Sequence, residues 1–167
     1  MAVLTACAPA GEPSGVEAPD SIPTPFSNEE EAFRAAEATY RAYVDALNQV
    51  DLADPATFEH VYEFASGDTL ATVQEEFTRM HARRWEVAGE TIVRVVEPLK
   101  ISEPARIVLA VCADVSGVTL MDPRGRSRVS SDRPDVHSLG VVVTKNRNGG
   151  WSVSEITGRS GKPKCAS

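Results

Sequence analysis

The sequence lacks the features that mark several common classes of protein. No run of about 18 apolar residues occurs in its 167 residues, so it predicts no transmembrane helix. Its 17 lysines and arginines are scattered and are outnumbered by 24 acidic residues, which argues against a nucleic-acid partner. Neither a phosphate-binding glycine loop nor a Gly-x-Ser-x-Gly elbow is present. Three histidines and three cysteines lie too far apart in sequence to suggest a metal site, and no cofactor is implied.

What is present at the amino terminus is a short motif. Residues 1–7 end in Leu4-Thr5-Ala6-Cys7, which resembles a bacterial lipobox, where a signal peptide is cut before a cysteine that becomes diacylated. The segment has no positively charged start and only about four apolar residues, where signal peptides have about 7–15. We therefore expect either that the coding sequence starts further upstream or that the short match is accidental.

The next segment, residues 8–27, has the composition of a tether. It contains five prolines and two glycines and almost no large apolar residue. Such a segment cannot bury enough surface to offset the entropy cost of ordering, so we expect an extended linker. A lipidated cysteine followed by a linker is the layout of an exported lipoprotein, held at the outer side of the bacterial cell membrane by two acyl chains on Cys7. The alternative is an ordinary disordered terminus with a chance cysteine.

The remaining two cysteines form an even pair if Cys7 carries the lipid. An exported chain is expected to join Cys112 and Cys165 in a disulfide. The bond would fasten the C-terminal tail, residues 159–167, to the sheet. It would close a loop of roughly 50 residues, worth about 4 kcal/mol in loop-closure entropy. The alternative is a buried free thiol at Cys112 and an unpaired Cys165.

The domain itself is expected over residues 28–158 and opens with a long helix. Ser27 and Glu30 match a capping box, with Ser27 as the N-cap. Apolar residues then recur at helical spacing from Phe33 to Val50, which predicts a helix that ends at about Val50.

Two shorter helices are expected next. Asp54-Pro55 predicts a helix start, with Asp54 as the cap and Pro55 at the first helical position, and Ser66-Gly67 is expected to end this helix. Asp68 is expected to cap a third helix, in a region that Gly89 ends.

From residue 91 on, β-branched and apolar residues predict antiparallel strands. The expected strands cover residues 91–96, 106–115, 136–145 and 151–157. Pro98 is expected to limit the first strand, and residues 118–121 to continue the second past a bulge at Gly117. Helices followed by antiparallel strands predict an α+β fold.

This layout resembles the NTF2-like superfamily, whose cone-shaped domain wraps a curved antiparallel sheet around N-terminal helices. The resemblance rests on the long first helix with Tyr40 and Tyr43, the short helix at Pro55 and the closing Gly-Gly-Trp-Ser-Val of residues 149–153. The sequence is also similar to actinobacterial lipoproteins with one cysteine in a central strand and another after the last strand. The resemblance implies N-terminal helices packed on a curved sheet of about four strands, and it does not transfer a function.

NTF2-like enzymes use an ionisable residue in the mouth of the cone. The candidates here are Asp114, Asp135, His137 and Tyr40. Asp114 follows Cys112 by two residues, so both are expected on one face of a strand, with His137 as a neighbour on the next strand. The favoured interpretation is that Asp114 begins the following turn, and no catalytic residue is assigned.

Two functions remain open. The favoured one is a non-enzymatic binding or interaction module of the cell envelope, whose partner is an unknown protein or small molecule and which could dimerise through its sheet face. The alternative is a SnoaL-like isomerase or cyclase, which needs an open cone of roughly 300 Å³ with Asp114 or His137 inside. A cone filled by aromatic side chains would argue against the enzyme; the residues in question are Phe33, Tyr40, Phe64, Phe77 and Trp85. Arg124, Arg126 and Arg128 are interpreted as a charged hairpin tip in preference to an anion site.

Overall fold

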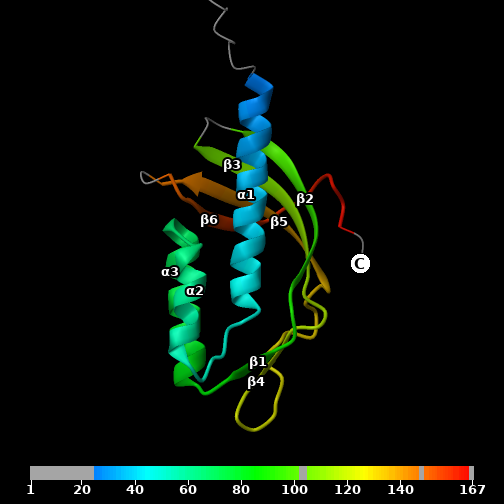
Figure 1. Ribbon diagram of the computed structural model, residues 1–167. Coiled ribbons are helices and arrows are strands. Elements are labelled where there is room, and N and C mark those ends of the chain that lie inside the picture. Colours follow the sequence, from blue (N-terminus) through cyan, green and yellow to red (C-terminus); the bar gives the residue numbers. More distant parts are fainter. Residues whose placement is uncertain (1–24, 102–104, 147–148, 166–167) are drawn as a thin grey trace, which may run out of the picture.

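The computed structural model describes residues 25–101, 105–146 and 149–165 (Figure 1). The expected leader, its Cys7 and the linker up to residue 24 lie outside these described residues. Within them, helices come first and antiparallel strands follow, which confirms the predicted α+β class. None of the described helices is both long and apolar enough to cross a membrane.

The helical part consists of α1 (Pro25–Leu47), the 3-10 helix η1 (Pro55–Thr57), α2 (Phe58–Glu63) and α3 (Gly67–Ala82). The capping prediction for α1 is wrong, because the helix starts at Pro25 and Ser27 lies inside its first turn. Proline fits a helix start, since the N–H that it lacks would have no helical partner there. α1 also ends at Leu47, before Val50.

The starts of the next helices follow local capping rules in part. The side chain of Asp54 accepts a hydrogen bond from the Ala56 N–H at 3.0 Å, as predicted, and Pro55 opens η1. The cap of α3 is Ser66 and not Asp68, which lies in the first turn of the helix. A carboxylate there still interacts favourably with the partial positive charge of the helix start.

The main sheet has four antiparallel strands in the order β2-β3-β5-β6. Their bounds are β2 Ile92–Ile101, β3 Arg106–Asp114, β5 Val136–Lys145 and β6 Trp151–Gly158. The prediction that Pro98 limits the first strand is wrong, because β2 continues through it to Ile101 with a register irregularity between Pro98 and Lys100. β2 is an edge strand, where a residue without an N–H donor is tolerated.

A second, two-stranded sheet pairs β1 (Glu86–Ala88) with β4 (Thr119–Met121). The sequence analysis did not predict β1, and it treated residues 118–121 as a continuation of β3. In the structure β4 leaves the main sheet and lies antiparallel to β1, at the end of the domain opposite the start of α1 (Figure 1).

The helices cover one face of the main sheet, and the core lies between them (Figure 1). Every second residue of β3 points into this core: Ile107, Leu109, Val111 and Ala113. Burial of each large aliphatic side chain contributes about 1.5–3 kcal/mol. Phe58 of α2 and Phe77 of α3 add an aromatic contact with ring centroids 4.9 Å apart.

The opposite face of β3 holds the C-terminal tail. Cys112 is buried on this face and forms a disulfide with Cys165, 53 residues later, with a Cα–Cα distance of 5.4 Å. This is the pair that the cysteine count predicts. Arg159 adds further attachment, because its backbone N–H donates to the Ser138 carbonyl at 2.9 Å and its guanidinium donates to the Leu139, Lys162 and Pro163 carbonyls.

Candidate functional site

The start of α3 is fixed directly onto strand β6. The Ser66 N–H donates to the Val153 carbonyl at 2.9 Å, and the Val153 N–H donates to the Phe64 carbonyl at 2.8 Å. The Ser66 hydroxyl receives a hydrogen bond from the Ser152 hydroxyl at 2.8 Å, so it does not cap the helix. Gly67 has a φ of +50°, and a Cβ there would lie 3.2 Å from the Ser154 carbonyl oxygen. Glycine therefore permits the close approach of α3 to β6.

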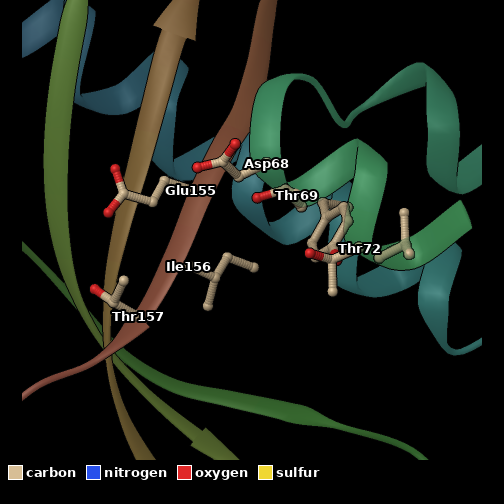
Figure 2. Close-up of a pocket in the computed structure, with 8 residues that line it drawn as sticks. Asp68, Thr69, Thr72, Glu155, Ile156 and Thr157 are labelled. Atoms are coloured by element: carbon tan, nitrogen blue, oxygen red, sulfur yellow. The ribbon is translucent and has the colours of Figure 1, made fainter. Parts of the chain in front are cut away.

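A groove of about 250 Å³ lies next to this junction (Figure 2). It is lined by one residue of α1, four of α3 and three of β6: Tyr43, Asp68, Thr69, Thr72, Val73, Glu155, Ile156 and Thr157. In Figure 2 the side chains of Asp68 and Thr69 are directed from the start of α3 toward β6. Glu155 pairs with Val142 in the ladder and Ile156 with the core residue Val141, so Asp68 and Glu155 line the groove from opposite sides of β6, with hydroxyl groups and apolar contact surface between them (Figure 2).

Thr69 is the most informative residue of the groove. It is only 5% exposed, and its Oγ1 is buried without a hydrogen-bond partner among the described residues. A buried hydroxyl without a partner costs free energy, about 1–3 kcal/mol.

The charges of the groove define what it can bind. Asp68 is exposed, and Glu155 is half-buried and 3.9 Å from the Arg106 guanidinium. Carboxylates only accept hydrogen bonds, so they favour a ligand with ammonium or hydroxyl donors. Burial raises the pKa of Tyr43 to about 12, so this side chain is a neutral phenol at physiological pH.

Asp114, the leading catalytic candidate from the sequence, is held in structural contacts. Its Oδ1 accepts a hydrogen bond from the Ser116 N–H at 2.9 Å, and its Oδ2 pairs with the Arg94 guanidinium. Arg94 lies at a register shift of β2, and such a bulge redirects a side chain. The hydrogen bonds from Ser116, followed by Arg94, lower the pKa of Asp114 to about 2. The carboxyl group therefore stays ionised and forms a turn, as the favoured interpretation had it.

The structure does not bring the other candidates to Asp114. His137 pairs with Ala113 in the ladder between β3 and β5, so it lies on the helix-facing side, opposite to Asp114. The expectation that Asp114 and His137 share a face is therefore wrong. Tyr40 is 2% exposed in the core, and burial raises its pKa. Asp135 is exposed, and its carbonyl accepts a hydrogen bond from the Val115 N–H.

The five aromatic side chains named above lie in or against the core between the helices and the main sheet. Tyr40 and Phe77 are buried, and Phe33, Phe64 and Trp85 are partly buried against the same core. The sequence analysis did not identify the groove, because Asp68 and Thr69 resembled an ordinary helix start and Glu155 an ordinary strand residue.

Comparisons with known proteins identify the fold. No protein-family model matches the sequence, and no curated protein matches it. The intermembrane space region of the chloroplast protein ARC6 is similar in structure, with a TM-score of 0.53 and 13% identity over 77% of this chain and 96% of that one. A protein from Catenulispora acidiphila is similar with a TM-score of 0.51 and 10% sequence identity, over 78% of this chain and 91% of that one. A structure from that organism in complex with S-DNPA has a TM-score of 0.50 and 10% sequence identity, over 77% of this chain and 92% of that one.

At these identities the likeness concerns the fold alone. Together with the helix order and the curved antiparallel sheet, it defines the class: an α+β domain whose N-terminal helices pack on a curved four-stranded antiparallel sheet, which is the architecture that the NTF2-like resemblance implies. This fold hosts unrelated functions, so what this particular domain does has to be argued from its own residues.

Proposed function

We propose that the chain is a non-enzymatic binding module of the bacterial cell envelope, tethered to the outer side of the cell membrane through a lipid on Cys7. The observation that carries the location is the disulfide between Cys112 and Cys165. Disulfides persist in oxidising compartments and are rare in the cytoplasm. With these two sulfurs joined, Cys7 is the cysteine left for lipidation, in agreement with its lipobox-like context.

The binding site of this module is the groove between α3 and β6. The exposed carboxylate of Asp68 and the carboxylate of Glu155 at the rim support a small ligand that carries ammonium and hydroxyl groups. A binding role fits these residues better than catalysis, because Tyr40 and Phe77 are buried in the core and Asp114 is held in an ion pair. The alternative, a SnoaL-like enzyme, would need an ionisable group inside an open cone.

The location is tested on the protein isolated from its native host. Free thiols are alkylated before and after reduction, and the mass of the amino-terminal peptide is measured. We expect a diacylglyceryl group on Cys7, and alkylation of Cys112 and Cys165 only after reduction. A Cys7→Ala variant should leave the membrane fraction. An unmodified amino terminus, or a reduced pair in freshly isolated protein, would overturn the proposed location.

The groove is tested by titration of the purified domain with D-glucosamine, which offers one ammonium group and several hydroxyls, followed by amide NMR. Shifts are expected at Asp68, Thr69 and Ile156, and the neutral N-acetylglucosamine should bind more weakly. The double variant D68N/E155Q should lose about tenfold in affinity, since each partly exposed charged contact contributes about 0.5–1 kcal/mol.

A matched control, E29Q/E31Q, removes two exposed carboxylates from α1 and should bind as the unaltered protein does. If neither sugar shifts the groove amides, or if the control and the groove variant lose affinity equally, the proposed site is wrong. The test of location and the test of the groove are independent of each other.

A further inference from the structure

A cluster of arginines surrounds Trp85 at the end of α3. The guanidinium carbon of Arg128 lies 4.9 Å from the ring centroid of Trp85, that of Arg83 lies at 5.4 Å and that of Arg79 at 5.8 Å. These distances allow cation–π attraction. Arg79 also pairs with Glu76, whereas in the described part of the chain Arg83 and Arg128 have no carboxylate within ion-pair distance.

The loop after β4 brings further arginines to the same place. The buried carboxylate of Asp122 organises this loop, accepting hydrogen bonds from the Arg124 N–H at 2.9 Å, the Arg126 N–H at 3.1 Å and the Arg126 Nε at 2.9 Å. Gly125 supplies a φ of +73° at the tip and donates its N–H to the Asp122 carbonyl. Asp122 thus fixes the loop and neutralises Arg126, but it leaves the Arg124 guanidinium without an acidic partner among the described residues.

Together these side chains line a basin of about 300 Å³. We call it the arginine basin, and its residues are Arg83, Trp85, Asp122, Pro123, Arg124, Arg126 and Arg128. Four guanidinium groups face one carboxylate, which leaves a formal charge of +3 on a chain whose net charge is −7. Like charges held together without compensation repel one another, and a bound anion would relieve this repulsion.

The backbone at the basin has an unusual conformation. Arg84 has a φ of +54° and is the one non-glycine residue with positive φ in the described part of the chain. The Trp85 N–H donates to the Met80 carbonyl and the Arg84 N–H to the His81 carbonyl, which is a Schellman end of α3. Glycine is usual at this position, and another residue there adds strain. The turn directs the chain from Arg83 into Trp85 at the wall of the basin.

We propose that the arginine basin binds a phosphate group, either as a free ion or on a phosphorylated ligand. Planar guanidinium groups match the oxygens of phosphate in bidentate geometry. A phosphomonoester carries a charge of about −1.5 to −2 at neutral pH. It therefore neutralises three uncompensated arginines better than a ligand with a single carboxylate, which carries a charge of −1. The anion site that the sequence analysis ranked second for Arg124, Arg126 and Arg128 is thus favoured, because the fold adds Arg83 and Trp85 to them.

The test uses Trp85 as a reporter. The protein has two tryptophans, so a Trp151→Phe variant leaves Trp85 as the one fluorescent indole. This variant is titrated with sodium tripolyphosphate, inorganic phosphate and citrate at constant ionic strength, and calorimetry on the unaltered protein repeats each titration. We expect a fluorescence change with tripolyphosphate, weaker binding of inorganic phosphate and still weaker binding of citrate. Added NaCl should weaken all three.

The double variant R124Q/R128Q should lose about tenfold in affinity for tripolyphosphate, as expected for the loss of two solvent-exposed charged contacts. The control Arg34→Gln removes one exposed guanidinium from α1, far from the basin in sequence, and should keep the affinity. Citrate binding as tight as that of tripolyphosphate would overturn the preference for phosphate. No binding, or binding that R124Q/R128Q leaves unchanged, would overturn the site itself.

Discussion

Loss of the disulfide should remove a large part of the stability of this domain. Cys165→Ala breaks the bond but leaves the buried Cys112 side chain in place, so no new cavity forms in the sheet. The bond closes a loop of 53 residues. Loop-closure entropy for this length gives about 4 kcal/mol, and a typical domain has about 5–15 kcal/mol in total. The variant should therefore fold but be close to the limit of stability.

The effect acts mainly through the unfolded chain, because Arg159 still holds the start of the tail to the carbonyls of β5. We expect the free energy of unfolding, measured by urea titration with far-UV circular dichroism, to fall by about 3–4 kcal/mol. The dependence on urea should become steeper, since an unfolded chain without the cross-link exposes more surface.

Two controls accompany this measurement. Lys164→Ala changes the neighbouring exposed residue and should leave the urea midpoint unchanged. A reductant should destabilise the unaltered protein as much as the substitution does, and it should have no effect on Cys165→Ala. A loss below about 1 kcal/mol would refute the argument from loop closure.

Three further predictions concern single positions. Hydrogen bonds to Asp114 lower its pKa from 3.8 to about 2, so its stabilising contribution is complete above pH 4 and is lost as the pH falls from 4 to 2. In the variant Asp114→Asn, the urea midpoint should depend less on pH between pH 4 and pH 2 than it does in the unaltered protein. An equal dependence in both proteins would contradict this. Arg84→Gly should raise the free energy of unfolding by about 0.5 kcal/mol, because relief of strain slightly exceeds the added entropy of the unfolded chain; a decrease would show that Arg84 is not strained. Thr69→Val, nearly equal in shape, should stabilise the free protein by about 1 kcal/mol by removing a hydroxyl without a partner, and thermal unfolding with and without D-glucosamine would show whether ligand binding suffers at the same time.

Local signals predicted most of the helices and strands and their order. Asp54 and Pro55 act on their own helix turn, so the helix start there could be predicted from adjacent residues. The strong apolar pattern of residues 106–114 predicted β3, because a strand with one face on the core and the other under the tail has few polar positions. Where signals compete, local rules failed. Ser27 resembles a cap, but Pro25 starts the helix first.

Strand pairing could not be predicted in the same way. β1 and β4 have three residues each, and such short segments form strands only because they meet each other across the fold. β2 passes through Pro98 because it lies at the sheet edge, a place that only the topology assigns. The register also decides which candidate residues share a face of the sheet. His137 pairs with Ala113 and not with Asp114, so His137 and Asp114 lie on opposite faces.

From the sequence alone the α+β class and the cysteines available for pairing could be predicted, since each of these follows from composition or from patterns within one element. Tertiary structure alone decided the two sites. Asp68 and Glu155 both line the groove, and Arg83 and Arg124 both line the basin, although each pair is distant in the chain. Binding sites of this kind arise where separate elements pack together, and packing depends on contacts that no local pattern encodes.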